Sequence, residues 1–383
     1  MNVLIPHGFE ANYSIGFARG LTSNGMTLVV LSNDETEDRL SAAGIRNVNI
    51  GGRQSENRSV LEKLLNMLRY YWKLLLFVFR NRGATIHFSG NFRDEFILFE
   101  GVILNLSFRL LASRYIYTTH NILPHNRESS LFFRWTYRFV YSVPHFIVVH
   151  TQKTRQVLIE RFGVPSAKIR VMSIGLNEEV PATVLGRQES RARFGFDGTA
   201  KVILFFGRIA EYKGLDHLIE AFDRLELPEI HLIIAGPFRG AAYRKRILAA
   251  IAGARRRADI LLDARLIPNE EVAVFFSASD VLCLPYRNIY QSGPLFLAMR
   301  FGKPVVATNV GSFSEFVTRD TGLITKTNDV PGIADALRDF FASSGRFRSE
   351  RILAEGERYR WGRVCQVLLP LYEAGNGSRS APP

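Results

Sequence analysis

The chain has 383 residues, of which 47% are hydrophobic and 22% are charged. This composition is typical of a folded globular protein and excludes an intrinsically disordered one, and the length favours two domains over one. The net charge of +13 favours anionic partners: phosphorylated small molecules, an acidic membrane surface or nucleic acid. The only cysteines, Cys283 and Cys365, cannot build a disulfide framework or a zinc site.

The first half of the chain alternates short apolar stretches with helical patterns, which is typical of parallel α/β sheets. It opens on a strand rather than on a basic and apolar leader, so we expect no secretory signal and a cytoplasmic location. Gly8 lies at the carboxyl end of the first strand, at the edge where open α/β sheets bind ligands. Strands are expected at 3–5, 27–31, 85–88, 114–118 and 146–149.

The segment 58–82 combines a long apolar stripe with basic and aromatic residues. As a helix it places Leu64, Leu68 and Trp72 on one face and Arg69 and Lys73 on another. Two interpretations are open: an amphipathic helix of the core with solvated charges, or a helix that lies on an anionic membrane surface. No run is long enough to span a membrane. A second basic and aromatic segment, 132–139, slightly favours the membrane interpretation.

His120 follows the expected strand 114–118 and therefore lies at the carboxyl edge of the first sheet. An imidazole that titrates near neutrality could orient a substrate or share protons there, although many histidines are only structural. Between 178 and 189 the chain becomes polar and loses its periodicity, so we place the domain boundary at residue 180. The first domain is then 1–180 and the second 181–357.

The second half repeats the pattern of strands and helices, which predicts a second doubly wound sheet. A final helix at about 358–374 is followed by a small, polar tail, 375–383, that we expect to be disordered. Two arginine-rich stretches, 243–246 and 255–257, raise the possibility of nucleic-acid binding, but a solvated helix face explains them as well and no nucleic-acid motif accompanies them. Strands are expected at 202–206, 230–235, 259–262, 281–284 and 305–307.

Two cations follow the strand 202–206, in the order Gly207, Arg208 and then Lys213, just before a helix. At a strand's carboxyl edge, beside the positive end of a helix, these cations would neutralise a diphosphate. The alternative is a pair of solvated loop charges. Gly236 ends the next strand, close to the same edge.

The stretch 280–315 is expected to form a strand, a polar loop, a helix that begins at Ser292 and Gly293, and a second strand. A glycine at a helix start leaves backbone N–H groups free and offers a site for an anion. The run 302–308 (GKPVVAT) followed by Gly311, together with the earlier motifs at 206–208 and 213–214, resembles the family 4 glycosyltransferases of the GT-B fold.

This resemblance implies two facing Rossmann-like domains with a cleft between them, the final helix crossing back to the first domain, and a nucleotide-sugar donor bound by the second. It implies that Arg208 and Lys213 hold the diphosphate and that His120 contacts the donor sugar. The chain departs from the family at its usual pair of glutamates, where Ile289 and Leu297 stand and where neither side chain can accept a hydrogen bond. The predicted donor-binding residues are Gly8, Gly207, Gly236, Asn288, Tyr290, Gln291, Ser292, Gly293 and Glu315.

The function expected from the resemblance is transfer of a hexosyl group to a glycan or lipid-linked acceptor in bacterial exopolysaccharide or surface-glycan synthesis. We expect retention of configuration, no metal, no cofactor other than the donor substrate, a peripheral position at the inner face of the plasma membrane through 58–82, and no nucleic-acid partner. Two alternatives share the architecture: a sugar-nucleotide epimerase, and a non-catalytic partner protein.

Overall fold

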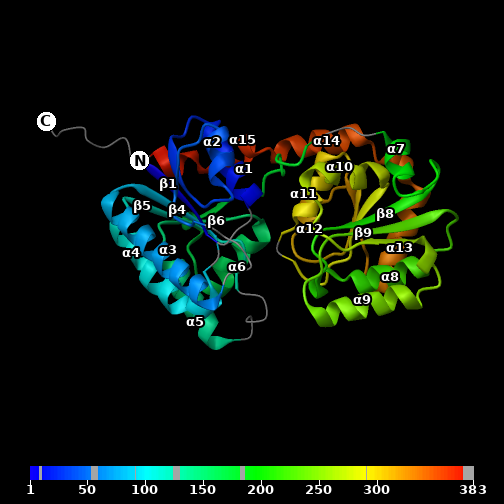
Figure 1. Ribbon diagram of the computed structural model, residues 1–383, viewed down its shortest axis with the longest axis horizontal. Helices are drawn as coiled ribbons and strands as arrows, with labels where there is room; N and C mark the ends of the chain where they lie inside the picture. The colour runs from blue at the N-terminus through cyan, green and yellow to red at the C-terminus, as the bar shows by residue number, and fades with distance from the viewer. Residues whose placement is uncertain are drawn as a thin grey trace. The chain divides into compact units, whose positions relative to one another are not determined.

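The computed structural model describes residues 1–7, 11–52, 59–90, 92–123, 130–181, 186–289 and 291–373. They form two compact units, the first made of Met1–Gly175 with the segment from Arg360 onward, and the second of Leu176–Tyr359. Each unit is a parallel sheet covered by helices (Figure 1). Three predictions concern Gly8, Tyr290 and the tail 375–383, all outside the described residues.

Within the described residues, unit 1 contains a seven-stranded parallel sheet in the order β3-β2-β1-β4-β5-β6-β7. The strands 28–32 and 85–90 are buried along their whole length, as expected for a parallel sheet covered on both sides by helices. The strands are β1 (Asn2–His7), β2 (Leu28–Ser32), β3 (Asn47–Asn49), β4 (Thr85–Gly90), β5 (Arg114–Thr118), β6 (Phe146–Val149) and β7 (Ile169–Val171).

The helices of unit 1 include one long helix, α3, whose start is fixed by a capping box between Ser59 and Glu62. A π-helix, η2 (Phe99–Leu104), runs directly into α4. The α-helices are α1 (Ala11–Thr22), α2 (Glu37–Ala42), α3 (Val60–Arg80), α4 (Asn105–Leu111), α5 (Leu131–Ser142), α6 (Gln152–Phe162), α15 (Trp361–Val364) and α16 (Leu369–Glu373), and the 3₁₀ helices are η1 (Asp94–Phe96), η3 (Ser166–Lys168) and η8 (Cys365–Leu368).

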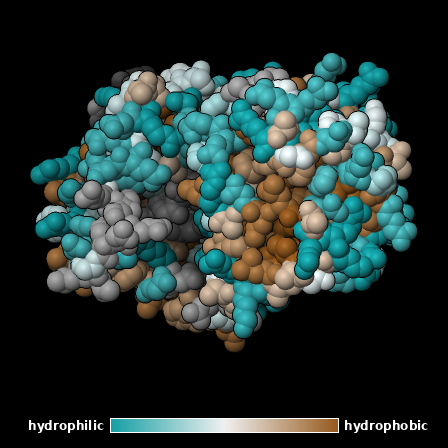
Figure 2. All heavy atoms as spheres, turned by 45° about the vertical axis from the view of Figure 1, so that its right-hand side comes forward, coloured by the Kyte–Doolittle hydropathy of each residue, from teal (hydrophilic) through white to brown (hydrophobic). Residues whose placement is uncertain are grey.

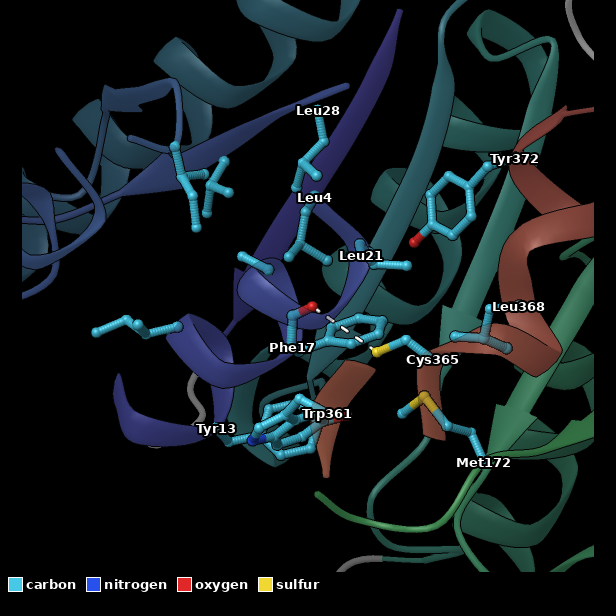
Figure 3. Close-up of a cluster of buried hydrophobic side chains, with 14 of the residues drawn as sticks. Leu4, Tyr13, Phe17, Leu21, Leu28, Met172, Trp361, Cys365, Leu368 and Tyr372 are labelled. Carbon is cyan, nitrogen blue, oxygen red and sulfur yellow. Dashed lines mark hydrogen bonds between the residues drawn. The ribbon is translucent and has the colours of Figure 1, made fainter. Parts of the chain in front are cut away.

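The returning C-terminal segment is anchored in unit 1 by Trp361, which is 2% exposed. Its indole ring packs edge-on against Tyr13, with ring centroids 5.0 Å apart, and beside Phe17 (Figure 3). A side chain at Gly16 or Gly175 would overlap with this ring, so the two glycines make room for it. The hydrophobic cluster around Trp361 therefore ties the end of the chain to the first sheet.

Unit 2 contains, within the described residues, a six-stranded parallel sheet in the order β10-β9-β8-β11-β12-β13. Its strands are β8 (Lys201–Phe206), β9 (Ile230–Ala235), β10 (Ile260–Asp263), β11 (Val281–Leu284), β12 (Val305–Ala307) and β13 (Gly322–Ile324). Its helices are α7 (Arg187–Ala192), α8 (Leu215–Asp223), α9 (Ala241–Gly253), α10 (Asn269–Ala278), α11 (Gly293–Arg300), α12 (Phe313–Phe316), α13 (Val330–Ala342) and α14 (Ser349–Gly356), with 3₁₀ helices η4 (Glu211–Lys213), η5 (Arg257–Asp259), η6 (Ser344–Arg346) and η7 (Glu357–Tyr359).

The prediction of two Rossmann-like parallel sheets is confirmed. The sequence analysis missed β3, β7 and β13, because three residues are too few to establish a strand pattern. The expected single helix at 358–374 is instead a series of short helices, α15, η8 and α16. Figure 2 shows one face of the molecule, where hydrophilic residues predominate and hydrophobic residues gather in a smaller area among them.

Candidate functional site

The strand order of unit 2 has a switch point between β8 and β11, because the sheet extends from β8 towards β10 on one side and from β11 towards β13 on the other. Open α/β sheets bind ligands outside the carboxyl ends of the strands at such a point. The loop after β8, residues 207–214, and the loop after β11, residues 285–292, both leave the sheet there. Most of the predicted site residues of this unit lie on these two loops.

Gly207 and Gly236 bring the ends of β8 and β9 close together. The N–H of Gly207 donates to the carbonyl of Ala235 over 2.8 Å, and a side chain at Gly236 would overlap with the carbonyl oxygen of Gly207. Both glycines have positive φ angles, +100° and +140°. Their lack of a side chain therefore keeps this edge of the sheet open to a close approach by a ligand.

Lys213 ends η4 and is 6% exposed. Its Nζ lies 5.3 Å from the centre of the Tyr286 ring, in cation–π geometry. A Cβ placed at Gly207 would lie 3.1 Å from this Nζ and 3.3 Å from Cγ of Pro294, in the first turn of α11. The ammonium group, the bare backbone after β8 and the start of α11 therefore meet at one place.

The loops of the site are locked to one another by backbone contacts at glycines. A side chain at Gly214 would overlap with the carbonyl oxygen of Pro285, and one at Gly311 would overlap with that of Ile289. The backbone N–H of Arg287 donates to the carbonyl of Tyr212 over 2.8 Å. The segments after β8, β11 and β12 therefore support one another, which favours a site that is formed before a ligand binds.

An ion-pair network reinforces this arrangement. Arg287 donates to Asp216 over 2.5 Å, and the Tyr243 hydroxyl donates to the same carboxylate over 2.9 Å. Burial opposes ionisation of Asp216, but these two donors outweigh it and keep the pKa of the carboxyl below its ordinary value. Arg287 on the loop after β11 is thereby tied to the first turn of α8.

Three buried polar atoms around the start of α11 have no partner in hydrogen-bond geometry among the described residues: Tyr286 OH, Gln291 Nε2 and Ser292 Oγ. Ser292 is the residue before the helix, but its side chain does not cap it. A buried polar group without a partner costs about 1–3 kcal/mol. A ligand with hydrogen-bonding groups at this place would remove that cost.

The start of α11 adds a backbone donor to the same place. Gly293 is exposed, and a side chain there would meet open space. Pro294 has no N–H, and the N–H of Leu295 donates to the Ser292 carbonyl over 3.2 Å, which leaves the Gly293 N–H at the positive end of the helix dipole. Together with the ammonium of Lys213, this end of α11 has the charge and a donor that suit a phosphate group.

The remaining predicted residues of unit 2 are more exposed. Arg208 follows Gly207, is exposed, and forms no ion pair among the described residues. The next residue, Ile209, forms a β-bridge with Phe238 of the neighbouring loop, and this bridge holds the backbone beside Arg208. Asn288 is exposed on the loop after β11, and Glu315 is exposed on the short helix α12. The observed contacts therefore bring Lys213 and Gly207 to the start of α11, where Ser292 and Gly293 lie.

Sequence reasoning missed Tyr286, whose ring lies under Lys213 and is buried. Its backbone carbonyl accepts from Oγ1 of Thr308 over 2.6 Å, so the residue after β12 fixes its position. The signal that could have found it is its place two residues after the end of β11, at the same sheet edge as the predicted residues. Leu297, one of the two replacements of the family glutamates, is 7% exposed in α11.

In unit 1, a cluster of buried polar side chains lies at the carboxyl ends of β4, β5 and β6. His120 is 4% exposed and His150 is 1% exposed. The His120 Nδ1 and His150 Nε2 atoms are 3.2 Å apart, and the Ser89 hydroxyl lies 3.4 Å from Nε2 of His120. Tyr13 packs edge-on against His120, with ring centroids 4.8 Å apart. The predicted residue is therefore part of a larger hydrogen-bonded group.

The hydrogen bonds fix the tautomers of these two histidines. Nδ1 of His150 lies 2.7 Å from the carbonyl oxygen of Met172, which can only accept, so Nδ1 carries the proton. Nε2 of neutral His150 is then an acceptor, and Nδ1–H of His120 donates to it. This leaves Nε2 of His120 as an acceptor for the Ser89 hydroxyl. The tautomers of both histidines therefore follow from the hydrogen bond that His150 donates to one backbone carbonyl.

Burial keeps the histidines of this cluster neutral. It lowers the pKa of His120 well below its ordinary value, with His150 and His87 contributing, and it lowers the pKa of His150 to about 4. The expectation that His120 titrates near neutrality is therefore wrong. His87 behaves in the same way: burial lowers its pKa to about 3, and its ring contacts Thr118 and the Tyr372 hydroxyl.

Within the described ranges, no three His, Cys, Asp or Glu side chains are grouped so that they could hold a metal ion. Among the helices of the same ranges, none has the length and apolar character that crossing a bilayer requires.

Comparison with known families matches most of the chain. The model described as "Glycosyltransferase Family 4" matches residues 11–180, and the model described as "Glycosyl transferases group 1" matches residues 186–356. The first range contains β2 to β7 of unit 1, and the second contains β8 to β13 of unit 2.

Curated relatives include the D-inositol 3-phosphate glycosyltransferases of Xylanimonas cellulosilytica and Streptomyces avermitilis. The first is 27% identical over 243 residues, which are 61% of this chain and 58% of that protein. The second is 28% identical over 239 residues, which are 60% of this chain and 51% of that protein. The matched part of the chain thus spans less than two thirds of the length of these relatives.

Similar solved structures cover nearly the whole chain. HepE of Anabaena in complex with UDP-glucose has a TM-score of 0.74 at 15% identity and covers 98% of this chain and 99% of its own. Sucrose-phosphate synthase of Thermosynechococcus elongatus has a TM-score of 0.76 at 17% identity, with the same coverage. At these identities the likeness shows the fold. With both family models matched in order along it, the chain belongs to the family 4 glycosyltransferases, which have the GT-B fold.

Proposed function

We propose that the protein transfers a sugar from a nucleotide-diphosphate sugar to a glycan or lipid-linked acceptor, in the synthesis of a bacterial exopolysaccharide or surface glycan at the cytoplasmic face of the membrane. The observation that carries the proposal is the buried Lys213, held beside Gly207 and the start of α11 at the switch point of unit 2. HepE of Anabaena, with a similar fold, has been solved with UDP and with UDP-glucose.

The donor's diphosphate is the group that this site fits best. It would accept hydrogen bonds from the Gly293 N–H at the start of α11 and from the Ser292 hydroxyl, which no described residue meets in hydrogen-bond geometry. Lys213 would neutralise the charge that grows on the diphosphate as the glycosyl bond breaks, and the exposed Arg208 would add to it. These are the roles that the sequence predicted for both residues.

His120 is proposed to orient the donor sugar. Because burial lowers its pKa well below neutrality, it acts as a neutral hydrogen-bonding group and not as a charge. Its proton on Nδ1 is directed to His150, so Nε2 is the atom that can accept from a sugar hydroxyl if Ser89 yields its place.

The reaction is proposed to retain the configuration of the sugar and to need no metal. The positive charge that supports the leaving diphosphate would come from Lys213, Arg208 and the dipole of α11. Leu297 and Ile289 stand where the family has glutamates, and neither can take a proton. The donor phosphate is therefore the base that we propose for the incoming acceptor hydroxyl.

The experiment is a nucleotide-release assay with UDP-, GDP- and ADP-sugars, with and without bacterial membranes as acceptor. We expect one donor to release nucleoside diphosphate only when the acceptor is present. Release without acceptor, together with an altered free sugar, would identify an epimerase instead. If a sugar nucleotide binds but no donor is consumed with any acceptor fraction, the protein is a non-catalytic partner and the proposal fails.

A further inference from the structure

The outer side of unit 1 carries one helical layer made of α3, η2, α4 and α5. The Tyr71 ring of α3 packs against Phe99 of η2, with ring centroids 5.0 Å apart, and the Tyr71 hydroxyl donates to Glu100. Nδ2 of Asn105 in α4 donates to the carbonyl of Val140 in α5 over 3.2 Å. These helices therefore lie side by side, as Figure 1 also shows.

The exposed side of this layer is strongly apolar. Helix α3 buries a narrow stripe made of Tyr71, Leu74 and Val78. The stripe that the sequence analysis considered for the core, which includes Trp72, faces outward instead. We call the following exposed residues the apolar face: Leu64, Leu65, Leu68, Trp72 and Phe79 on α3, Ile103, Leu106 and Leu110 on η2 and α4, and Leu131, Phe132, Trp135 and Phe139 on α5.

The apolar face is accompanied by basic side chains. Helices α3, α4 and α5 contain seven basic residues and one acidic residue, Glu62, which is engaged in the cap of α3. Each of the seven is exposed, and none forms an ion pair among the described residues. They are Lys63, Arg69, Lys73, Arg80, Arg109, Arg134 and Arg138.

We infer that the apolar face and these seven cations together bind the surface of an anionic lipid bilayer, with Trp72 and Trp135 inserted at the interface. Trp72 is 71% exposed and Trp135 is 70% exposed, and indole rings favour the boundary between headgroups and acyl chains. Unpaired cations beside apolar side chains fit anionic headgroups above a hydrocarbon layer. The inference deepens the proposed function and rests on it, since a lipid-linked acceptor would be found there.

The charges also decide between possible occupants of this surface. A second copy of the chain, docked through the same face, would bring two sets of seven unpaired cations together, which electrostatic repulsion opposes. An anionic bilayer instead neutralises them, and it can cover helices from three separate parts of the sequence at once.

The three tryptophans allow a direct experiment. Trp361 is 2% exposed and buried in the core of unit 1, so a change of tryptophan emission on vesicle binding reports Trp72 and Trp135. The full chain would be mixed with vesicles that contain phosphatidylglycerol and with vesicles of phosphatidylcholine alone. We expect a shift of the emission to shorter wavelength and co-sedimentation with the anionic vesicles only, both weakened by added salt.

Variants locate the binding surface. The double variant Trp72→Gln/Trp135→Gln should partition onto anionic vesicles about tenfold less, or worse, because two large apolar groups are removed. The matched control is Leu248→Gln/Leu266→Gln, which removes two exposed apolar residues of unit 2, 41% and 78% exposed, and should bind as the unchanged protein does. Circular dichroism and melting temperature check that each variant is folded.

Three results would overturn the inference: no co-sedimentation of the unchanged protein with anionic vesicles, equal binding by the double tryptophan variant, or a stable dimer that this variant abolishes. A thermal-shift measurement with UDP-, GDP- and ADP-sugars on the same samples separates this inference from the proposed function. Donor binding without vesicle binding would contradict the lipid-binding surface and leave the transferase proposal intact. Vesicle binding without binding of any sugar nucleotide would support the lipid-binding surface and contradict the transferase proposal.

Discussion

Several surface cations of unit 2 differ from those of α3, α4 and α5 in unit 1 in what surrounds them. In unit 2, Arg246 lies 2.6 Å from Glu211, Arg256 lies 3.0 Å from Asp259, and Arg265 pairs with Glu271. In unit 1, the seven basic residues of α3, α4 and α5 have no ion-pair partner in the described part of the chain. The net charge of +13 therefore says little by itself, because the acids that the fold places beside a cation decide whether it is available.

The two sheets differ in a similar way at their carboxyl edges. Unit 1 presents buried histidines whose pKa values are lowered by burial, so this edge is uncharged at neutral pH. Unit 2 presents a buried ammonium group, that of Lys213, beside the start of α11. This contrast agrees with the division of roles proposed for Lys213, which would hold a charged diphosphate, and for His120, which would act as a neutral hydrogen-bonding group.

The largest effect should come from removing the cation of unit 2. Lys213→Met keeps the length and apolar part of the side chain but leaves the developing phosphate charge without its ammonium, so we expect transfer to fall about a hundredfold or more. Lys245→Met, on an exposed lysine of α9, is the matched control and should leave the rate unchanged. Normal turnover by the Lys213→Met variant would contradict the role proposed for Lys213. The measurement is the initial rate of acceptor-dependent nucleotide release.

The neutral edge of unit 1 should make this unit sensitive to acid. In the unfolded chain His87 titrates near its ordinary pKa of about 6.5, whereas burial lowers the folded value to about 3. The contribution of neutral His87 to the free energy of unfolding is therefore fully present above about pH 6.5 and is lost progressively as the pH falls towards 3. At pH 4.5 the loss from His87 alone is about 2–3 kcal/mol. Tryptophan emission follows this unfolding, because all three tryptophans lie in unit 1.

The check is urea unfolding near neutral pH and near pH 4.5, for the unchanged protein and for His87→Gln. The variant loses packing and is less stable at neutral pH, but its loss of stability between the two pH values should be smaller. An identical pH dependence would show that His87 is not buried as a neutral group.

The glycines that lock the loops of unit 2 offer a third test. Gly311 has a φ of +57°, and a side chain there would overlap with the carbonyl oxygen of Ile289, so Gly311→Ala should destabilise the protein by about 1–3 kcal/mol. Gly253, at the end of α9, has open space around it, and Gly253→Ala should be neutral or slightly stabilising. Melting temperatures of the two variants compare these effects, and equal values would contradict the close packing of the loops.

The smallest effect concerns single surface charges and addresses the first comparison most directly. Lys73→Gln or Arg134→Gln should weaken binding to anionic vesicles about fivefold per charge. Arg246→Gln and Arg265→Gln, which remove cations already paired in unit 2, should not change it. Losses of the same size in both sets would mean that net charge, and not the position of unpaired cations, governs binding.

The sequence predicted the fold well because the strands and the family motifs are local patterns. A local pattern such as the motif 302–308 does not reveal which of its residues contact a ligand and which only support the fold. Lys303 is partly buried and donates to the carbonyl of Ser279 over 2.9 Å, and desolvation lowers its pKa to about 8, so its observed contacts are structural. Lys213, in contrast, lies beside the start of α11.

The site was only partly predictable. The helix start at Ser292 and Gly293 and the cation at Lys213 follow from spacing, but Tyr286 enters the site through a contact between loops far apart in sequence. The tautomer of His120 depends in the same way on the Met172 carbonyl after β7, a strand that the sequence did not indicate. For α3, the apolar stripe was visible in the sequence, but which side of it packs on the sheet is decided by its neighbours.

The most direct test of the central claim asks whether Lys213 recognises the diphosphate itself. Calorimetric titration would compare the affinities of UDP and uridine, repeated with the guanosine pair and the adenosine pair, for the unchanged protein and for Lys213→Met. We predict that, for the nucleotide that fits the site, the diphosphate form binds much more tightly than the nucleoside and that this advantage collapses in the variant, while nucleoside affinity is unchanged. An undiminished preference for the diphosphate in Lys213→Met would contradict the account.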